Sequence, residues 1–265
     1  MAKIQCNVIS YTLRRTVDIT VTIPTPTFPA IFGMGVKDGE KARHTPKEKY
    51  PVLYLLHGMG NNNQQWTGYT NVEMYAEEQQ IVVVNLAGEN RFYMEQFGDD
   101  FFTFVSEELP DFITGTFPVS ERPEDTYIAG LSMGGFGTLL HAMSHPEKYC
   151  AFGVFSAGGK GLDPNQSIVP LEAMPEERIP WNLIELNAEK GIAFPKGYLA
   201  IGTEDHGYEG CKATYELLKE KGADVTWDEI EGYGHEWRFW DIEVEKFLKW
   251  LPRTDAYAKD GPRQI

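Results

Sequence analysis

The 265-residue sequence has few cysteines and no long apolar run, and each shortage excludes a class of protein. Its three cysteines form no C-x-x-C pair and have no metal-site spacing to a histidine. We interpret them as reduced thiols, which favours a cytoplasmic protein. No run approaches 18 apolar residues, so no membrane span is expected. The first ten residues lack the apolar segment of a signal peptide, although secretion after removal of a signal stays an alternative.

Positive charge is also scarce, with 24 Lys and Arg against 39 Asp and Glu, a net charge of −15 and a pI of about 4.8. A surface this acidic repels phosphate backbones and anionic lipids, so neither a nucleic acid nor a membrane is expected as a partner. The hydrophobic content of 42% is ample for one core. We predict a single domain over residues 1–265. A homo-oligomer is compatible with the sequence, which leaves the oligomeric state open.

Short apolar runs alternate with helical patterns along most of the chain, which predicts βαβ units and a parallel sheet. The runs cover residues 52–56, 81–86, 126–129, 151–156, 198–202 and 225–230. Residues 4–23 alternate polar and apolar, which predicts an antiparallel hairpin. The predicted fold class is therefore α/β, with a mostly parallel central sheet, helices on both faces and an N-terminal hairpin. Helices are expected at about 66–80, 101–113, 211–221 and 237–251.

Two segments do not fit this pattern. Residues 160–196 contain several prolines and no clean helical period, so a lid or cap could sit there. Residues 252–265 are expected to form a frayed tail.

Serine is rare, with seven in the chain, and one of them stands in a G-x-S-x-G over Gly130–Gly134. A buried strand precedes this motif and a helix follows, which is the context of the nucleophile elbow of α/β-hydrolases. At such a turn the serine has a strained backbone and its hydroxyl lies exposed above the sheet. The alternative is a glycine-rich turn with an idle serine. We expect Ser132 to be the nucleophile because of the residues that follow the later strands.

Ligands of an open parallel sheet bind beyond the carboxyl ends of its strands. Glu204 and Asp205 follow the fifth run and His235 follows the sixth, which gives the order serine, acid, histidine of the α/β-hydrolases. Successive side chains alternate in direction, so one of the two acids faces the site. His235 is the expected base because it alone follows the last strand. The other histidines are placed elsewhere: His44 in a charged loop, His57 in a glycine-rich turn, His141 and His145 on the helix after the elbow, and His206 beside the acid.

Acyl transfer also needs donors for the developing oxyanion. The backbone N–H of Met133 follows the nucleophile, and the loop after the first buried run should provide the second donor from Met59 or, next, Gly58. Trp181 is the tryptophan that we expect to touch substrate. The sequence contains no metal-ligand set and no phosphate loop, so no cofactor or metal is expected.

Several segments together resemble the esterase D-type family of α/β-hydrolases. They are YPVLYLLHGMG, EELPDFI, IAGLSMGGFGTL, FSAG, GTEDxxYEG and GxGHEWxFWD. Within that family the chain is most similar to bacterial tributyrin, feruloyl and acetyl esterases. The resemblance implies a cofactor-free serine carboxylesterase with Ser132, Asp205 and His235 at the triad positions, and it favours Asp205 over Glu204. The S-formylglutathione hydrolase branch usually carries a cysteine soon after the glycine of the first strand, and none follows Gly58 here.

The expected reaction is hydrolysis of short-chain or aryl esters of acetyl, butyryl or feruloyl type through an acyl-enzyme. The substrate is a small or saccharide-linked ester, with side chains of plant polysaccharides among the candidates. A thioesterase such as S-formylglutathione hydrolase, or an acyltransferase, on the same triad is the alternative. A binding protein on a hydrolase fold would require a broken triad, and the sequence shows none.

Overall fold

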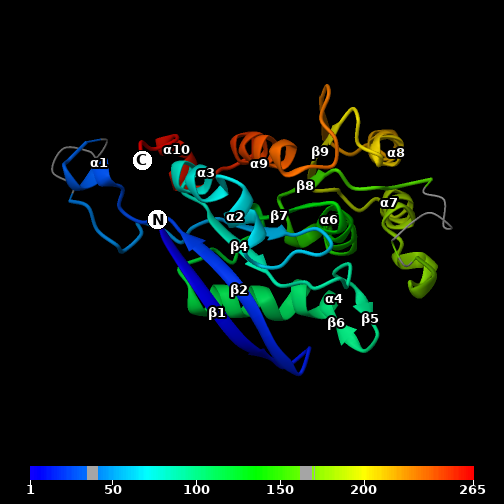
Figure 1. The fold of residues 1–265 in the computed structure, drawn as a ribbon, viewed down its shortest axis with the longest axis horizontal. Helices are drawn as coiled ribbons and strands as arrows, with labels where there is room; N and C mark the ends of the chain where they lie inside the picture. The colour runs from blue at the N-terminus through cyan, green and yellow to red at the C-terminus, as the bar shows by residue number, and fades with distance from the viewer. Residues whose placement is uncertain (35–40, 162–168, 170) are drawn as a thin grey trace.

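The centre of the computed structural model is a sheet with strand order β1-β2-β4-β3-β7-β8-β9-β10 (Figure 1). The structure describes residues 1–34, 41–161, 169 and 171–265. Over these residues the sheet strands are β1 (Ala2–Ser10), β2 (Arg15–Ile23), β3 (Val52–Leu56), β4 (Val82–Leu86), β7 (Thr126–Leu131), β8 (Ala151–Phe155), β9 (Lys196–Gly202) and β10 (Val225–Ile230). A separate small hairpin pairs β5 (Glu95–Gln96) with β6 (Asp99–Asp100).

Strands β3, β4 and β7 to β10 are parallel, whereas β1 and β2 form an antiparallel hairpin that joins the sheet through β4. The predicted mostly parallel sheet with its N-terminal hairpin is confirmed. The inner strands β3, β4 and β8 are buried at every position and mostly apolar, because both faces of the sheet are covered. In β3, for example, Val52, Tyr54 and Leu56 pack in one core cluster, and Leu53 and Leu55 pack in the other.

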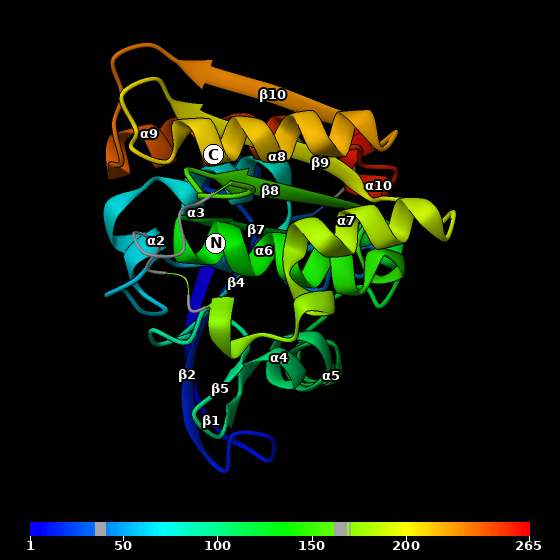
Figure 2. The same ribbon diagram turned by 90° about the vertical axis from the view of Figure 1, so that its right-hand side faces the viewer.

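Helices cover the two faces in two groups (Figure 2). One face carries α4 (Phe101–Thr103), the π-helical segment η1 (Phe104–Glu108), α5 (Leu109–Thr116), α6 (Met133–Ser144), α7 (Pro180–Glu189) and α8 (Tyr208–Glu220). The other carries α2 (Gln65–Tyr69), α3 (Val72–Gln79) and α9 (Trp237–Trp250). Short helices elsewhere are α1 (Phe28–Ile31), η2 (Pro123–Asp125), η3 (Pro146–Lys148), η4 (Leu171–Ala173), η5 (Glu176–Arg178) and α10 (Ala256–Asp260). No helix among the described residues is long and apolar enough to cross a membrane.

Two of the expected helices are less regular than the sequence pattern indicates. The helix expected over residues 66–80 is divided into α2 and α3, because Thr70 has an extended backbone between them. The helix expected over residues 101–113 runs through the π-helical segment η1, where one residue more is accommodated per turn. The apolar spacing that predicted these helices still describes which residues face the core.

The prediction of a frayed C-terminal tail is wrong. Tyr257 on α10 is buried and stacks on Tyr50, with ring centroids 4.7 Å apart. Arg253 and Asp255 form a buried ion pair of 2.7 Å just before this helix. The Tyr257–Tyr50 contact joins the tail to a residue some 200 positions earlier, which local sequence patterns do not reveal.

The segment 160–196 is more regular than predicted where the structure describes it. Helix α7 packs on α6, with Ile184 fully buried and the Asn187 side-chain amide donating to the Met143 carbonyl at 2.7 Å. Residues 162–168 and 170 lie outside the described residues. The lid at this segment therefore stays a prediction, as does the single-domain assignment.

Candidate active site

Ser132 occupies the turn between β7 and α6. Its backbone has φ 53° and ψ −118°, a conformation that non-glycine residues adopt at a cost of roughly 1–3 kcal/mol. The turn is held on both sides, because the Ser132 N–H donates to the Phe155 carbonyl at 2.9 Å and the Ser132 carbonyl accepts from the Phe136 N–H at 3.0 Å. The serine is thus fixed at the carboxyl edge of the sheet.

The glycines on either side of Ser132 are required by close packing of α6 on the sheet. A Cβ on Gly130 would lie 2.4 Å from the Gly134 carbonyl oxygen, and one on Gly134 would lie 2.3 Å from the Leu56 carbonyl oxygen. Both contacts are with backbone atoms, which cannot move aside as a flexible side chain can. Any larger residue at these positions would therefore push α6 and the serine away from β3.

His235 lies between Ser132 and Asp205. Its Nε2 is 3.0 Å from the Ser132 Oγ, and its Nδ1 is 2.9 Å from Asp205 Oδ2. The three side chains come from three separate loops, after β7, β9 and β10, that meet at one edge of the sheet. The Glu204 side chain, the other acid suggested by the sequence, is exposed to solvent. The structure therefore brings Ser132, Asp205 and His235 together and leaves Glu204 outside.

The Asp205 carboxylate is buried, with 4% of the residue exposed. Burial alone would raise its pKa, but hydrogen bonds from His235 and from the Gly207 N–H, the latter at 2.8 Å to Oδ1, outweigh burial and hold the pKa of Asp205 below its ordinary value. Asp205 is therefore ionised at neutral pH. The His235 ring packs edge-on against Trp240, with centroids 5.0 Å apart, and this contact limits its rotation.

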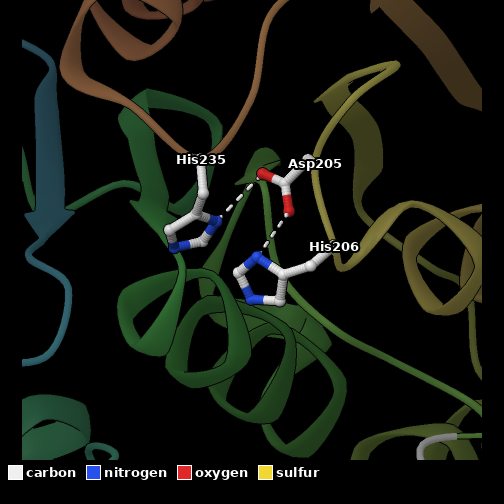
Figure 3. Close-up of side chains that lie close together, drawn as sticks. All are labelled: Asp205, His206 and His235. Carbon is white, nitrogen blue, oxygen red and sulfur yellow. Dashed lines mark hydrogen bonds and ion pairs between the residues drawn. The ribbon is translucent and has the colours of Figure 1, made fainter.

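A second histidine contacts the same carboxylate (Figure 3). His206 Nδ1 lies 3.6 Å from Asp205 Oδ1, and the His206 and His235 rings are 4.7 Å apart. The sequence indicated only that His206 adjoins the acid. Its approach to His235 depends on the loop after β10, so spacing along the chain could not have revealed it.

One predicted oxyanion donor, Met133, follows Ser132 in the chain, and the other, Met59, follows Gly58 in a loop near the serine. Met133 is the first residue of α6, where backbone N–H groups have no partner inside the helix. The loop with Gly58 and Met59 runs beside the serine, since a Cβ on Gly58 would lie 3.5 Å from the Ser132 Cβ. Within the described residues neither the Met59 nor the Met133 N–H donates a hydrogen bond to the protein. Both are available to an anion.

His57 holds this loop in place through hydrogen bonds to its backbone and to a neighbouring loop. Its Nε2 accepts from the Gly88 N–H at 2.8 Å, so its Nδ1 carries the proton and donates to the Gly58 carbonyl at 2.7 Å. Burial lowers the pKa of His57 to about 4, which keeps the ring neutral. The Tyr93 hydroxyl donates to the His57 carbonyl at 2.9 Å. These bonds position the Gly58–Met59 backbone relative to Ser132.

Trp181, the predicted substrate contact, stands at the start of α7. It is half-buried and packs against the core cluster on the α6 side of the sheet. Its contact with substrate stays a prediction.

Comparison with known proteins identifies relatives over most of the chain. A family model named Esterase and described as "Putative esterase" matches residues 41–241. The chain is 26% identical to an acetyl esterase of Caldicellulosiruptor saccharolyticus, over 96% of this chain and 99% of that protein. It is 29% identical to an endo-1,4-beta-xylanase/feruloyl esterase of Xylanibacter ruminicola, over 77% of this chain but 27% of that protein.

Solved structures show the same fold. The S-formylglutathione hydrolase FrmB of Staphylococcus aureus superposes with a TM-score of 0.78 at 23% identity, covering 94% of this chain and 98% of that chain. At this identity the likeness concerns the fold. The chain belongs to the Esterase family of enzymes and has the α/β-hydrolase fold.

Proposed function

We propose that the protein is a serine carboxylesterase that hydrolyses short-chain or aryl esters through an acyl-enzyme on Ser132. The observation that carries this proposal is the continuous hydrogen-bonded path from the Ser132 Oγ through the His235 ring to the Asp205 carboxylate, with distances of 3.0 and 2.9 Å. A serine hydroxyl is a weak nucleophile at neutral pH and needs a base within this range.

The geometry supports a two-step reaction. The Ser132 Oγ attacks the ester carbonyl while His235 Nε2 accepts the hydroxyl proton, and Asp205 stabilises the imidazolium. The backbone N–H groups of Met59 and Met133 stabilise the oxyanion of the tetrahedral intermediate. His235 then returns the proton to the leaving alcohol. Water attacks the acyl-enzyme by the same proton route, which releases the acid and restores Ser132.

Aromatic side chains near His235 support an aryl or saccharide-linked substrate. Tyr69 is 63% exposed and stacks on Trp237, with ring centroids 5.2 Å apart. Trp237 contacts Trp240, which in turn packs against His235. Flat exposed rings bind phenyl groups and sugar faces well because little conformational freedom is lost. The acetyl and feruloyl esterase relatives point to the same range of acyl groups.

A thioesterase on the same triad is the second candidate, and the structural likeness to an S-formylglutathione hydrolase favours it. The loop from His57 to Gly60 contains no cysteine. Because the S-formylglutathione hydrolase branch usually carries a cysteine there, the carboxylesterase is preferred.

The test is a substrate panel with the wild-type enzyme and Ser132→Ala. We expect turnover of p-nitrophenyl acetate, p-nitrophenyl butyrate and methyl ferulate by the wild type, with loss of nearly all activity in the variant. Equal rates for the two proteins would contradict the proposal. Faster hydrolysis of S-formylglutathione than of every oxygen ester would assign the thioesterase function instead.

A further inference from the structure

The Asp205 carboxylate lies between two imidazole rings, each of which turns its Nδ1 toward a different carboxylate oxygen (Figure 3). One ligand atom from each of Asp205, His206 and His235 can be chosen so that all three lie within 4.8 Å of one another. The described serine reaction uses only one of the two histidines. The second, His206, has a side chain that is 78% exposed and is free to turn.

We propose that Asp205, His206 and His235 form a binding site for a divalent transition-metal ion such as Zn²⁺, and that the bound ion inhibits the esterase. The inhibition depends on the proposed function, but the metal site itself does not. Two imidazole nitrogens and a carboxylate oxygen are a ligand set that Zn²⁺ accepts, with water in the fourth position.

The three ligand atoms already lie near the spacing of a zinc site. Ligands at about 2.0–2.2 Å from a tetrahedral Zn²⁺ lie roughly 3.3 Å apart. The present separations are 2.9 Å between His235 Nδ1 and Asp205 Oδ2, and 3.6 Å between His206 Nδ1 and Asp205 Oδ1. These two distances involve different oxygens of the carboxylate, and the three ligand atoms lie within 4.8 Å of one another, so a rotation of the exposed His206 side chain must bring its ring nitrogen closer to the other two. The Gly207 N–H, which already bonds Asp205 Oδ1 at 2.8 Å, would hold the carboxylate in place.

Metal binding would remove the catalytic base through a change of tautomer. In the free enzyme His235 Nδ1 carries the proton and faces Asp205, so Nε2 can accept the proton of Ser132. A metal ion bonds to the lone pair of Nδ1, so the ring proton must leave Nδ1. This proton moves through solvent to Nε2, and the ring loses no net proton. Nε2 then donates rather than accepts. The Ser132 hydroxyl loses its base although every residue remains in place.

The choice of ion follows from the ligands. Imidazole nitrogen binds Zn²⁺ and Cu²⁺ well, whereas Mg²⁺ and Ca²⁺ prefer sites made of oxygen ligands. Zn²⁺ is the better probe because it has no redox chemistry. Mg²⁺ is the matched negative control.

The kinetic test compares Zn²⁺ inhibition of ester hydrolysis in the wild type, His206→Asn and His44→Asn, each relative to its own rate without metal. His44 is exposed and precedes β3, at the opposite edge of the sheet. Half-inhibition of His206→Asn should require a Zn²⁺ concentration at least about tenfold higher than for the other two proteins, since even second-shell losses weaken metal sites by that factor. Mg²⁺ should leave all three rates unchanged. Equal Zn²⁺ sensitivity of wild type and His206→Asn would overturn the proposal.

Calorimetric titration with Zn²⁺ separates this inference from the proposed function. Ser132→Ala lacks the nucleophile but keeps all three ligands, so it should bind Zn²⁺ as the wild type does. The double variant Ser132→Ala/His206→Asn should bind it at least about tenfold more weakly. Equal binding by these two proteins would refute the metal site whether or not the protein is an esterase, and loss of hydrolysis has no influence on this measurement.

Discussion

His57 and His235 follow two parallel strands at the same edge of the sheet, yet their surroundings differ in every respect. His57 is 1% exposed, and both its ring nitrogens bond to backbone groups, the Gly58 carbonyl and the Gly88 N–H. The His235 side chain is 27% exposed, and its nitrogens face the Asp205 carboxylate and the Ser132 hydroxyl. One ring is held between immobile backbone dipoles. The other lies between a carboxylate that stabilises its charged form and a hydroxyl whose proton it can accept.

This difference shows that the partners of a histidine, more than its position, decide what it can do. A buried ring with a pKa near 4 stays neutral and acts as a fixed donor and acceptor. A ring between a carboxylate and a hydroxyl can become charged and return the proton. We therefore expect substitutions of His57 to affect mainly stability, and those of His235 mainly catalysis.

The largest effect is expected for His235→Ala. Ester hydrolysis should fall by roughly 10⁶-fold, because removal of the base disables the whole triad. Thermal unfolding should change far less than activity, since the ring is partly exposed. Turnover of p-nitrophenyl acetate and a melting curve measure the two quantities. Activity within tenfold of the wild type would contradict the role of His235.

The acid is tested by a matched pair, Asp205→Asn and Glu204→Gln. Each removes one negative charge from neighbouring positions, but only Asp205 bonds His235. Asp205→Asn should reduce kcat by roughly 10⁴-fold, because an amide favours the wrong imidazole tautomer. Glu204→Gln, on an exposed side chain, should keep nearly full activity. The reverse order of effects would assign the acid to Glu204.

His57→Phe should destabilise the fold more than it impairs the chemistry. The phenyl ring keeps much of the volume but leaves the Gly88 N–H and the Gly58 carbonyl without partners, at a cost of about 3 kcal/mol in the free energy of unfolding. Urea unfolding measures this change, with His44→Phe as the exposed control. The loss of kcat should be far smaller than for His235→Ala. An unchanged unfolding free energy would show that His57 does not support the loop.

The smallest effect concerns acid sensitivity. Burial lowers the pKa of His57 to about 4 and that of His141 to about 3. In the unfolded chain both histidines have the ordinary pKa of about 6.5. Between about pH 6.5 and 4 they therefore bind protons in the unfolded chain but not in the folded one. Stability from both rings is complete above about pH 6.5 and declines as the pH falls through this window. From about pH 7 to about pH 5 the loss should be about 2 kcal/mol per histidine.

His141→Phe checks this pH dependence by urea unfolding at the two pH values. The variant should lose less stability on acidification than the wild type, even where it is less stable at neutral pH because the bond from the ring to the Tyr93 carbonyl is gone. Equal pH dependence of the two proteins would show that His141 is not the source.

The parts of the fold that were predicted best are those whose pattern of apolar residues is complete within a short stretch of sequence. The inner strands are mostly apolar because helices cover both faces of the sheet, and this pattern is visible in five or six residues. Helix α7 and the docked tail were missed. Ile184 and Tyr257 are buried by contacts with distant residues, and no local period marks them.

The sequence by itself determined the strand–turn–helix around Ser132, because glycine spacing, the apolar strand and the helix are local properties that steric limits convert directly into geometry. It also placed an acid and a histidine after later strands. Only the tertiary structure decided that Asp205 rather than Glu204 contacts His235, that His206 joins them, and that His57 is buried. The burial of a side chain and the charges near it depend on loops that are distant in the chain. They are therefore decided only when the sheet brings those loops to one edge.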